Sequence, residues 1–426
     1  MAEFSADVFQ NEFLPDGGTD VHAVVSVTCT GAGEAGSGEG GDAAEIVIID
    51  TSGSMQGDKI VAARQAAAAA IDQIRDGTFF AVISGTDGAS RAFPYPNATA
   101  AMVRMEPGAR EAAKEAVRRL LAGGGTAIGS WLRLATALFE TVPSATQRHA
   151  ILLTDGKNQS ETSETLRASV RAAQGRFQCD CRGIGVDWDV REVREVATAL
   201  LGTVDLVPSP GELAAEFEAL MRQAMGRGVA EATLRIWAPQ GSQVLFVRQV
   251  APQVEDLTGR RRQLNPLTVA FPTGAWGDET REYHVAVRLA AKPIGSEQLA
   301  ARVQVAVGDQ VVASGLVKAL WSDNDDLTTR INPAVAHYTG QAELADVIQE
   351  GLAAKAAGDT ATATTKLGRA VQLAAETGNE ETTSRLRKVV DVEDPGTGRV
   401  RLRRDVDKLD EMALDTASTK TTRVKR

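Results

Sequence analysis

Cysteine, histidine and aromatic residues are scarce in this chain of 426 residues. It contains 3 cysteines and 4 histidines, and aromatic residues make up 4% of it. Three cysteines are odd in number and too few for a disulfide framework, which indicates a reducing compartment. Cys179 and Cys181 stand two residues apart in a predicted strand, where we expect them to pack in the core rather than to bind metal or carry redox chemistry.

Membrane-spanning and secretory signals are also lacking. No apolar run approaches the roughly 20 residues that a spanning helix needs. The start, MAEFSADVFQNEFLPDGG, carries early acids instead of the basic and then apolar layout of a secretory signal. The formal net charge of −10 opposes binding of the whole protein to nucleic acid or to an anionic membrane. We therefore expect a cytoplasmic protein with no nucleic-acid partner and no membrane insertion.

The length and the hydrophobic patterns predict several folded parts, because one hydrophobic core rarely supports a chain this long. Residues 1–30 contain a strand pattern at VHAVVSVTCT, and residues 31–44 form a Gly-rich linker. Between residues 45 and 226, strands alternate with helices. This alternation predicts an α/β domain with a doubly wound, mostly parallel sheet that is covered on both faces.

The second half of the chain changes character twice. Residues 228–322 read as short strands separated by Gly, Pro or polar residues, which is typical of a β-sandwich. The doubly wound domain either precedes this sandwich or is inserted in it, in which case the strand in residues 1–30 joins the sandwich. Residues 331–390 predict a helical hairpin of tetratricopeptide-like character. Residues 391–426 are rich in charge and threonine, so we expect a largely disordered tail.

The pattern that carries chemistry lies where strands of the doubly wound domain end. The buried strand EIVII leads into Asp50, and Ser52 and Ser54 follow on the next loop. Asp155 ends another buried strand, and Thr126 follows a glycine run that lets the backbone come close. In open α/β sheets, ligands bind beyond the carboxyl ends of the strands. The residues expected to meet at this edge are Asp50, Ser52, Ser54, Thr126 and Asp155.

Two carboxylates and three hydroxyls are hard oxygen ligands without imidazole or thiolate. Such a set suits Mg²⁺, which we predict as the bound ion, with Mn²⁺ or Ca²⁺ as alternatives, rather than zinc. Two carboxylates only neutralise a dication. The predicted site therefore keeps an open position that an Asp or Glu of a protein partner can fill.

These residues resemble the metal-ion-dependent adhesion site of von Willebrand factor A-type domains, which have a Rossmann-like fold. The resemblance rests on DTSGSM from Asp50 to Met55, on Gly125-Thr126 and on TDG from Thr154 to Gly156, and it spans about residues 44 to 226. The resemblance implies that the metal is ligated or oriented by Asp50, Ser52, Ser54 and Thr126, with Asp155 often acting through water. The order of parts is similar to that of bacterial intracellular members of the family.

The same residues could also be read as an enzyme's active site, but the sequence lacks the additional catalytic groups that such a site needs. A serine nucleophile at Ser52 or Ser54 needs a nearby base. His149 begins the strand that ends at Asp155, about 20 Å away at strand rise, and the remaining histidines lie in other parts of the chain: His22, His284 and His337. A phosphatase of the D-x-D type would need an acid where Ser52 stands, and no phosphate-binding glycine loop with Lys occurs. We expect Asp187 and Asp189 to serve a turn and a helix cap.

The sequence thus predicts a non-enzymatic, metal-dependent adaptor or scaffold that binds an acidic residue of a protein partner. The alternative is a subunit of an ATPase-partnered complex of the metal-chelatase or assembly type. Hydroxyls in a disordered basic tail are accessible to a kinase, so a Ser/Thr kinase and an FHA-like phosphopeptide-binding protein are further expected partners. The expected phosphorylation sites are Thr416, Thr419, Thr421 and Thr422.

Overall fold

The computed structural model describes residues 2–36 and 42–424. The chain forms two compact units, one made of Ala32–Ala230 with Gly274–Gly277, the other of Met1–Gly31, Glu231–Thr273 and Asp278–Arg426. Of the predicted Gly-rich linker, residues 37–41 lie outside the described residues, and residues 42–44 already belong to a strand. The first unit contains the doubly wound sheet, and the second contains the sandwich and the C-terminal helices.

The sheet of the first unit has the strand order β10-β9-β8-β4-β5-β6, with β7 paired to β5. Its strands are β4 (Asp42–Asp50), β5 (Phe79–Gly85), β6 (Ala89–Phe93), β7 (Val103–Arg104), β8 (Ala145–Thr154), β9 (Gln178–Ile184) and β10 (Val204–Val207). Strands β5, β4, β8, β9 and β10 run parallel, whereas β6 and β7 are antiparallel to β5. The carboxyl ends of β4 and β8, which are neighbours, therefore lie at the same edge.

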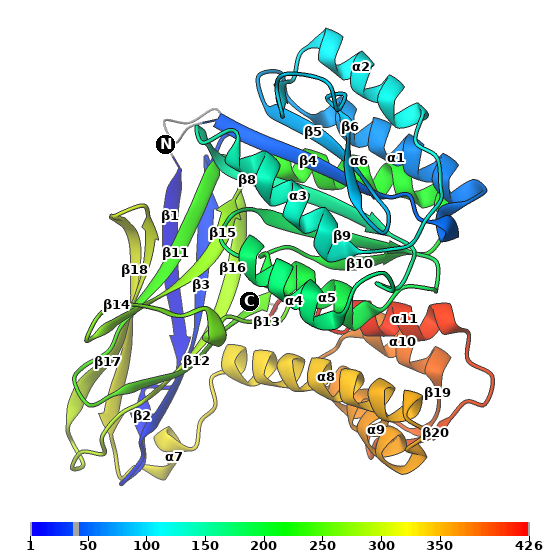
Figure 1. Cartoon of the computed structure of the whole chain (residues 1–426). Coiled ribbons are helices and arrows are strands. Elements are labelled where there is room, and N and C mark those ends of the chain that lie inside the picture. The colour runs from blue at the N-terminus through cyan, green and yellow to red at the C-terminus, as the bar shows by residue number, and fades with distance from the viewer. Residues whose placement is uncertain (1, 37–41, 425–426) are drawn as a thin grey trace. The chain divides into compact units, whose positions relative to one another are not determined.

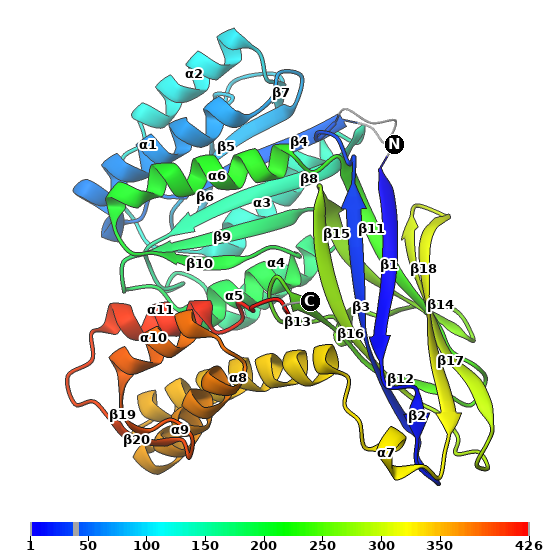
Figure 2. The ribbon, with the colours of Figure 1, turned by 180° about the vertical axis from the view of Figure 1, so that it is seen from behind.

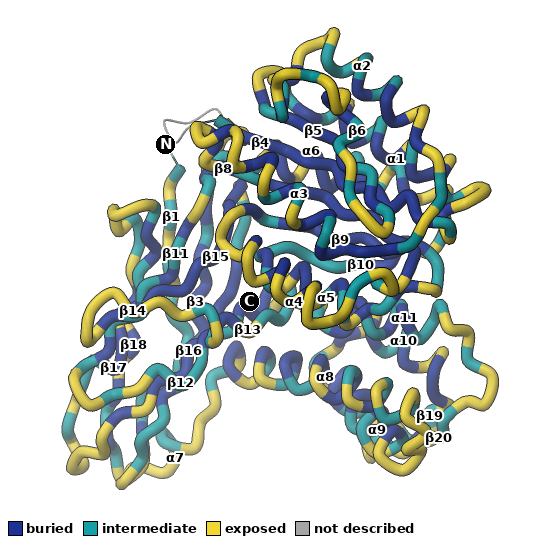
Figure 3. Tube along the Cα trace, in the orientation of Figure 1, coloured by how far each residue is buried: buried dark blue, intermediate teal, exposed yellow. Residues whose placement is uncertain are grey.

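Helices cover both faces of this sheet (Figures 1 and 2). They are η1 (Gly53–Met55), α1 (Asp58–Gln73), α2 (Pro107–Arg118), α3 (Ile128–Glu140), α4 (Ser163–Ala173), α5 (Val190–Ala199), η2 (Pro210–Glu212) and α6 (Leu213–Met225). Val47 and Ile49 of β4 share a core with α1, α2 and α6. Because side chains alternate along a strand, Ile46 and Ile48 point to the other face. This explains the continuous apolar run: β4 is buried from residue 43 onward (Figure 3).

The β-sandwich of the second unit consists of two sheets, ordered β1-β3-β16-β12-β13 and β14-β15-β11-β17-β18-β2. The strands are β1 (Glu3–Gln10), β2 (Phe13–Leu14), β3 (Asp20–Thr30), β11 (Val229–Trp237), β12 (Gln243–Ala251), β13 (Glu255–Asp256), β14 (Arg262–Asn265), β15 (Thr268–Trp276), β16 (Glu279–Arg288), β17 (Glu297–Val307) and β18 (Gln310–Trp321), with η3 (Thr258–Arg260). Strand β3 pairs with both β1 and β16. The doubly wound unit is thus an insertion between strands of one sandwich, and the predicted fold class is confirmed.

The C-terminal region contains more helices than the predicted hairpin. Its elements are α7 (Asp325–Thr328), α8 (Pro333–Ala356), α9 (Thr360–Glu376), α10 (Glu380–Val389), β19 (Val390–Asp394), β20 (Arg399–Leu402) and α11 (Lys408–Ala417). Residues 331–390 thus form three successive helices, α8, α9 and α10, instead of two. Asn379 caps the third of them by accepting a hydrogen bond from the backbone N–H of Thr382.

The predicted disorder of residues 391–426 is wrong for the described part of that segment. Some of its apolar side chains, Val400 and Leu414 among them, join the core of α8, α9 and α10. Beyond α11, the backbone N–H of Val254 donates to the carbonyl of Thr419. Low apolar content predicts disorder for a segment on its own. This segment instead docks on a core that other helices supply, and it therefore needs few apolar contacts of its own.

The expected phosphorylation sites are consequently not free hydroxyls on a disordered tail. Thr416 is 1% exposed and donates to the carbonyl of Met412. Thr421 donates to the carbonyl of Val250, and Thr422 accepts a hydrogen bond from Gln341. Thr419 is half-buried in the same segment.

No helix within residues 2–36 and 42–424 is both long enough and apolar enough to cross a membrane. Cys179 and Cys181 are fully buried in β9, with their sulfurs 3.9 Å apart, and both are free thiols. This burial agrees with the core role predicted for them.

Candidate metal centre

The loop after β4 forms the base of the candidate site. Asp50 is fully buried at the end of the strand, and its Oδ1 accepts a 2.8 Å hydrogen bond from the backbone N–H of Ser52. A hydrogen bond that an aspartate accepts from the backbone N–H two residues later commonly stabilises a tight turn. The turn brings Ser52 Oγ within 2.9 Å of Ser54 Oγ. Met55 anchors the loop, because its side chain is fully buried in the core below.

The end of β8 joins the same cluster. Thr154 Oγ1 donates to Asp50 Oδ2 at 2.7 Å, and Ser54 Oγ donates to Asp155 Oδ1 at 2.6 Å. Asp155 is fully buried, like Asp50, whereas Ser54 is exposed at the surface. The parallel register of β4 and β8 therefore places two buried carboxylates and two serine hydroxyls together, as the strand pattern predicted.

The loop between α2 and α3 contributes Thr126. Backbone hydrogen bonds fix this loop on the β4 loop: Gly123 N donates to Thr51 O at 2.8 Å, and Gly53 N donates to Gly124 O at 2.9 Å. Ser160 holds its other side, since Ser160 Oγ accepts from Thr126 N at 3.1 Å. Because Gly124 adopts a φ of +81°, glycine suits this tight path.

Three hydroxyl oxygens converge on a small space beside Gly156. A Cβ atom built on this glycine would lie 3.1 Å from Thr126 Oγ1, 3.2 Å from Ser54 Oγ and 3.9 Å from Ser52 Oγ. Because Gly156 has no side chain, a space remains between the three hydroxyl oxygens. The carboxylates of Asp50 and Asp155 belong to the same cluster. Hydroxyl and carboxylate oxygens are the donors that Mg²⁺, Mn²⁺ and Ca²⁺ prefer, so the residues present fit a divalent cation.

Burial disfavours the ionised form of the Asp50 carboxylate. Burial raises the pKa of Asp50 above its ordinary value, and the nearby Asp155 adds to this, while hydrogen bonds from Ser52 and Thr154 partly oppose it. A metal ligand must be ionised, so a bound dication would stabilise the form that burial disfavours. A cation beside Asp50 would therefore stabilise its carboxylate.

Lys59 also reaches this cluster, a residue that the sequence analysis missed. Its Nζ lies 2.5 Å from Asp155 Oδ2. The signal available in the sequence was its position in the first turn of the helix that directly follows the serine loop. Thr154 was missed as well, although it stands in the TDG string beside Asp155.

The other candidates have structural partners. Asp189 caps α5 by accepting from the backbone N–H groups of Arg191 and Glu192. His149 is engaged at both ring nitrogens, at 2.7 Å from Glu45 Oε2 and 2.9 Å from Asp180 Oδ2, and so is not poised as a base for a serine. Within the described ranges, no group of three or more His, Cys, Asp or Glu residues is placed to hold a metal. The oxygen cluster at Asp50 is of a different kind, because it combines two carboxylates with three hydroxyls.

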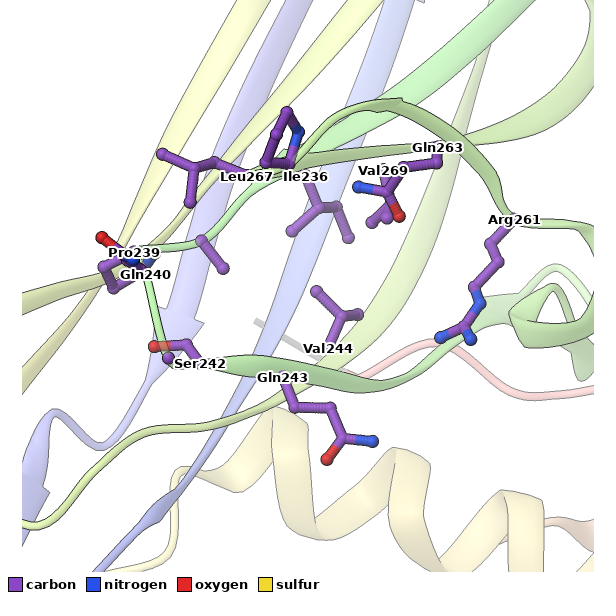
Figure 4. Close-up of a pocket in the computed structure, with 13 residues that line it drawn as sticks. Ile236, Pro239, Gln240, Ser242, Gln243, Val244, Arg261, Gln263, Leu267 and Val269 are labelled. Atoms are coloured by element: carbon purple, nitrogen blue, oxygen red, sulfur yellow. The ribbon is translucent and has the colours of Figure 1, made fainter.

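The sandwich contains a separate pocket of about 480 Å³ (Figure 4). Ile236, Val244 and Val269 contribute apolar surface, while Arg261 and Gln263 are polar residues of the lining. The described residues that line this pocket include no carboxylate, imidazole or thiol. Its chemistry is therefore unrelated to that of the oxygen cluster.

Comparisons with known proteins match both units. A model of the von Willebrand factor type A domain matches residues 44–206, and a model of the von Willebrand factor type A C-terminal domain matches residues 372–418. The structure is similar to von Willebrand factor type A from Catenulispora acidiphila, with 48% sequence identity and a TM-score of 0.93 over 99% of this chain and 97% of that chain.

Two further relatives are more distant. The ArnB paralog VWA2 from Sulfolobus acidocaldarius shares the fold, with a TM-score of 0.58 and 15% identity over 98% of each chain. An uncharacterized protein of Synechocystis sp. is 28% identical over 218 residues, which are 50% of this chain and 49% of that protein. The chain thus matches about half the length of this curated relative.

Proposed function

Because the chain belongs to the von Willebrand factor type A family, we propose that it is a non-enzymatic adaptor that binds an acidic residue of a protein partner through a divalent cation. The cation would be held by Asp50, Ser52, Ser54 and Thr126, with Asp155 supporting it. The observation that carries the proposal is the convergence of three hydroxyls and two buried carboxylates beside Gly156.

Each residue has a defined part in this proposal. Asp50 supplies charge from a buried position that Ser52 N and Thr154 Oγ1 keep fixed. The hydroxyls of Ser52, Ser54 and Thr126 supply neutral oxygens and so add no negative charge. A bound dication would act as a Lewis acid toward one carboxylate of the partner. Since Mg²⁺ prefers oxygen ligands, we propose Mg²⁺ as the physiological ion.

The predicted role in kinase signalling assumed accessible hydroxyls in a disordered tail, and the described part of the tail is ordered. Phosphorylation of Thr416 would require α11 to open, because the Thr416 side chain is buried and its hydroxyl is bonded inside this helix. We therefore propose an adaptor whose binding depends on the metal site and not on the tail. The chelatase-type alternative uses the same oxygen cluster and remains a prediction.

Metal-dependent capture tests the proposal. The full chain is immobilised in Mg²⁺ or in chelator, exposed to an extract of its native host, and the retained proteins are identified by mass spectrometry. We expect a partner that chelator releases, that Asp50→Ala does not retain, and that loses binding when one of its own acidic residues becomes an amide.

The matched control is Asp309→Ala, which removes an exposed carboxylate from the turn between β17 and β18 of the other unit and should leave capture unchanged. Thermal unfolding of both variants checks that the fold persists. If folded Asp50→Ala retains the same proteins as the unaltered chain, the proposed role of the metal site is wrong.

A further inference from the structure

Lys59 stands at a helix N-terminus, where a positively charged side chain is not expected. It stands in the first turn of α1, where the helix dipole favours anions and disfavours cations. Its ammonium group nevertheless turns to the oxygen cluster and lies 2.5 Å from Asp155 Oδ2. The Lys59 side chain is 26% exposed, while that of Asp155 is fully buried.

The turn after β9 leaves space for this lysine. Gly185 adopts a φ of +70°, and a Cβ built there would lie 3.7 Å from Lys59 Cε and 3.8 Å from its Nζ. The backbone of this turn therefore runs beside the lysine side chain. Trp188 fixes the turn, because its indole N–H donates to Gly185 O at 3.1 Å. The Lys59 side chain thus lies beside this turn, with Asp155 accepting a hydrogen bond from its ammonium group.

The charges at the rim suggest why a lysine stands there. Asp50 and Asp155 together would neutralise a dication and leave the loaded centre without charge. When the ammonium of Lys59 is counted with Asp50, Asp155 and the dication, this group of four charges keeps one positive charge. A carboxylate from outside then restores neutrality, and in a partly buried place such charge matching is far stronger than in water.

We propose that Lys59 is the residue that makes this centre selective for an anionic partner group. It weakens the hold of the protein on the dication alone and strengthens the binding of a carboxylate once the dication is in place. This inference rests on the proposed function, because it concerns the same metal centre. It adds a specificity-determining residue outside the predicted set of ligands.

The test measures two affinities that should change in opposite directions. Mn²⁺ binding to the full chain is followed by electron paramagnetic resonance, and glutarate binding to the Mn²⁺-loaded chain by isothermal titration calorimetry. For Lys59→Met we expect Mn²⁺ to bind roughly tenfold more tightly and glutarate to bind roughly tenfold more weakly, since one positive charge is lost near both.

Two further variants separate charge from structural damage. Lys59→Arg keeps the positive charge and should stay close to the unaltered chain in both measurements. Lys157→Met removes an exposed lysine just after Gly156, where solvent screens its charge, and should change either affinity much less. A generally damaged site would instead lose affinity for both Mn²⁺ and glutarate.

The outcomes separate this inference from the proposed function. If the unaltered chain binds no Mn²⁺, the metal centre itself is refuted. If it binds Mn²⁺ and Lys59→Met leaves both affinities unchanged, or shifts both in the same direction, the metal centre stands and the role of Lys59 is refuted.

Discussion

Gly156 creates the space around which the candidate centre is arranged. The hydroxyls of Ser54 and Thr126 lie 3.2 and 3.1 Å from the position that a Cβ would take on this glycine. Its place in the TDG string made Gly156 part of the resemblance, but the spacing of residues in a sequence does not show which backbone atoms approach which side chains. The residue types of the cluster were therefore predictable, whereas the hydrogen bonds within it were not.

Substitution of Gly156 by alanine should weaken metal binding without unfolding the protein. The added methyl group would occupy the space between the hydroxyls and force Thr126 or Ser54 to move by a few tenths of an ångström. We expect Mn²⁺ affinity, measured by electron paramagnetic resonance, to fall at least roughly tenfold, because ligands displaced by such amounts lose coordination geometry.

Gly123→Ala is the control, since a Cβ on that glycine of the same rim meets no atom within 4 Å. Unchanged Mn²⁺ affinity in Gly156→Ala would show that the space beside this glycine is not where the cation binds.

His149 provides a residue-scale prediction away from the centre. Burial alone would lower its pKa, but Glu45 and Asp180 on either side raise the pKa to about 9. The unfolded chain has a histidine pKa of about 6.5. The folded state thus holds the proton more tightly, so the stabilisation is fully present below about pH 6.5 and is lost as the pH rises through 9.

We expect the free energy of unfolding, measured with denaturant, to fall by on the order of 2 kcal/mol between pH 6.5 and 9. In His149→Gln, which cannot be protonated, this pH dependence should be much smaller. A pH slope in that range that is the same in both proteins would exclude His149 as its source.

At the scale of elements, strand ends and helix starts were predictable because their patterns are strong. The continuous apolar run of β4 requires burial on both faces, and helical periodicity marks α1 and α3. The tail was not predictable, because its order comes from partners distant in sequence. Thr421 reaches Val250, and the backbone N–H of Val424 donates to Tyr338 Oη at 3.4 Å.

Removing the Thr421 hydroxyl tests the docking of this segment. In Thr421→Val, the carbonyls of Val250 and Pro252 lose a donor that lies 2.7 and 3.1 Å away. We expect a loss of about 1 kcal/mol in the free energy of unfolding, measured by denaturant titration.

Thr365→Val is the control, because that exposed hydroxyl donates to Ala361 O within its own helix. Equal stability of Thr421→Val and the unaltered protein would show that the segment after α11 is not held as described.

At the scale of the whole molecule, the chain combines a doubly wound unit with a sandwich whose strands come from both sides of the insertion. The pairing of β3 with β16 joins residues 250 or more positions apart, and the strand pattern in residues 1–30 was the signal for it in the sequence. The sandwich and the C-terminal helices form one compact unit, and the oxygen cluster lies wholly in the other. The proposed metal binding and carboxylate capture would therefore be properties of the doubly wound unit.

The central claim is that the Asp50 cluster holds one divalent cation. Titration of Mn²⁺ into the full chain, followed by electron paramagnetic resonance, measures this directly. The account predicts one Mn²⁺ per chain that Mg²⁺ displaces, and loss of this binding in a folded Asp50→Ala variant. No binding to the unaltered chain at millimolar Mn²⁺, or undiminished binding to Asp50→Ala, would contradict it.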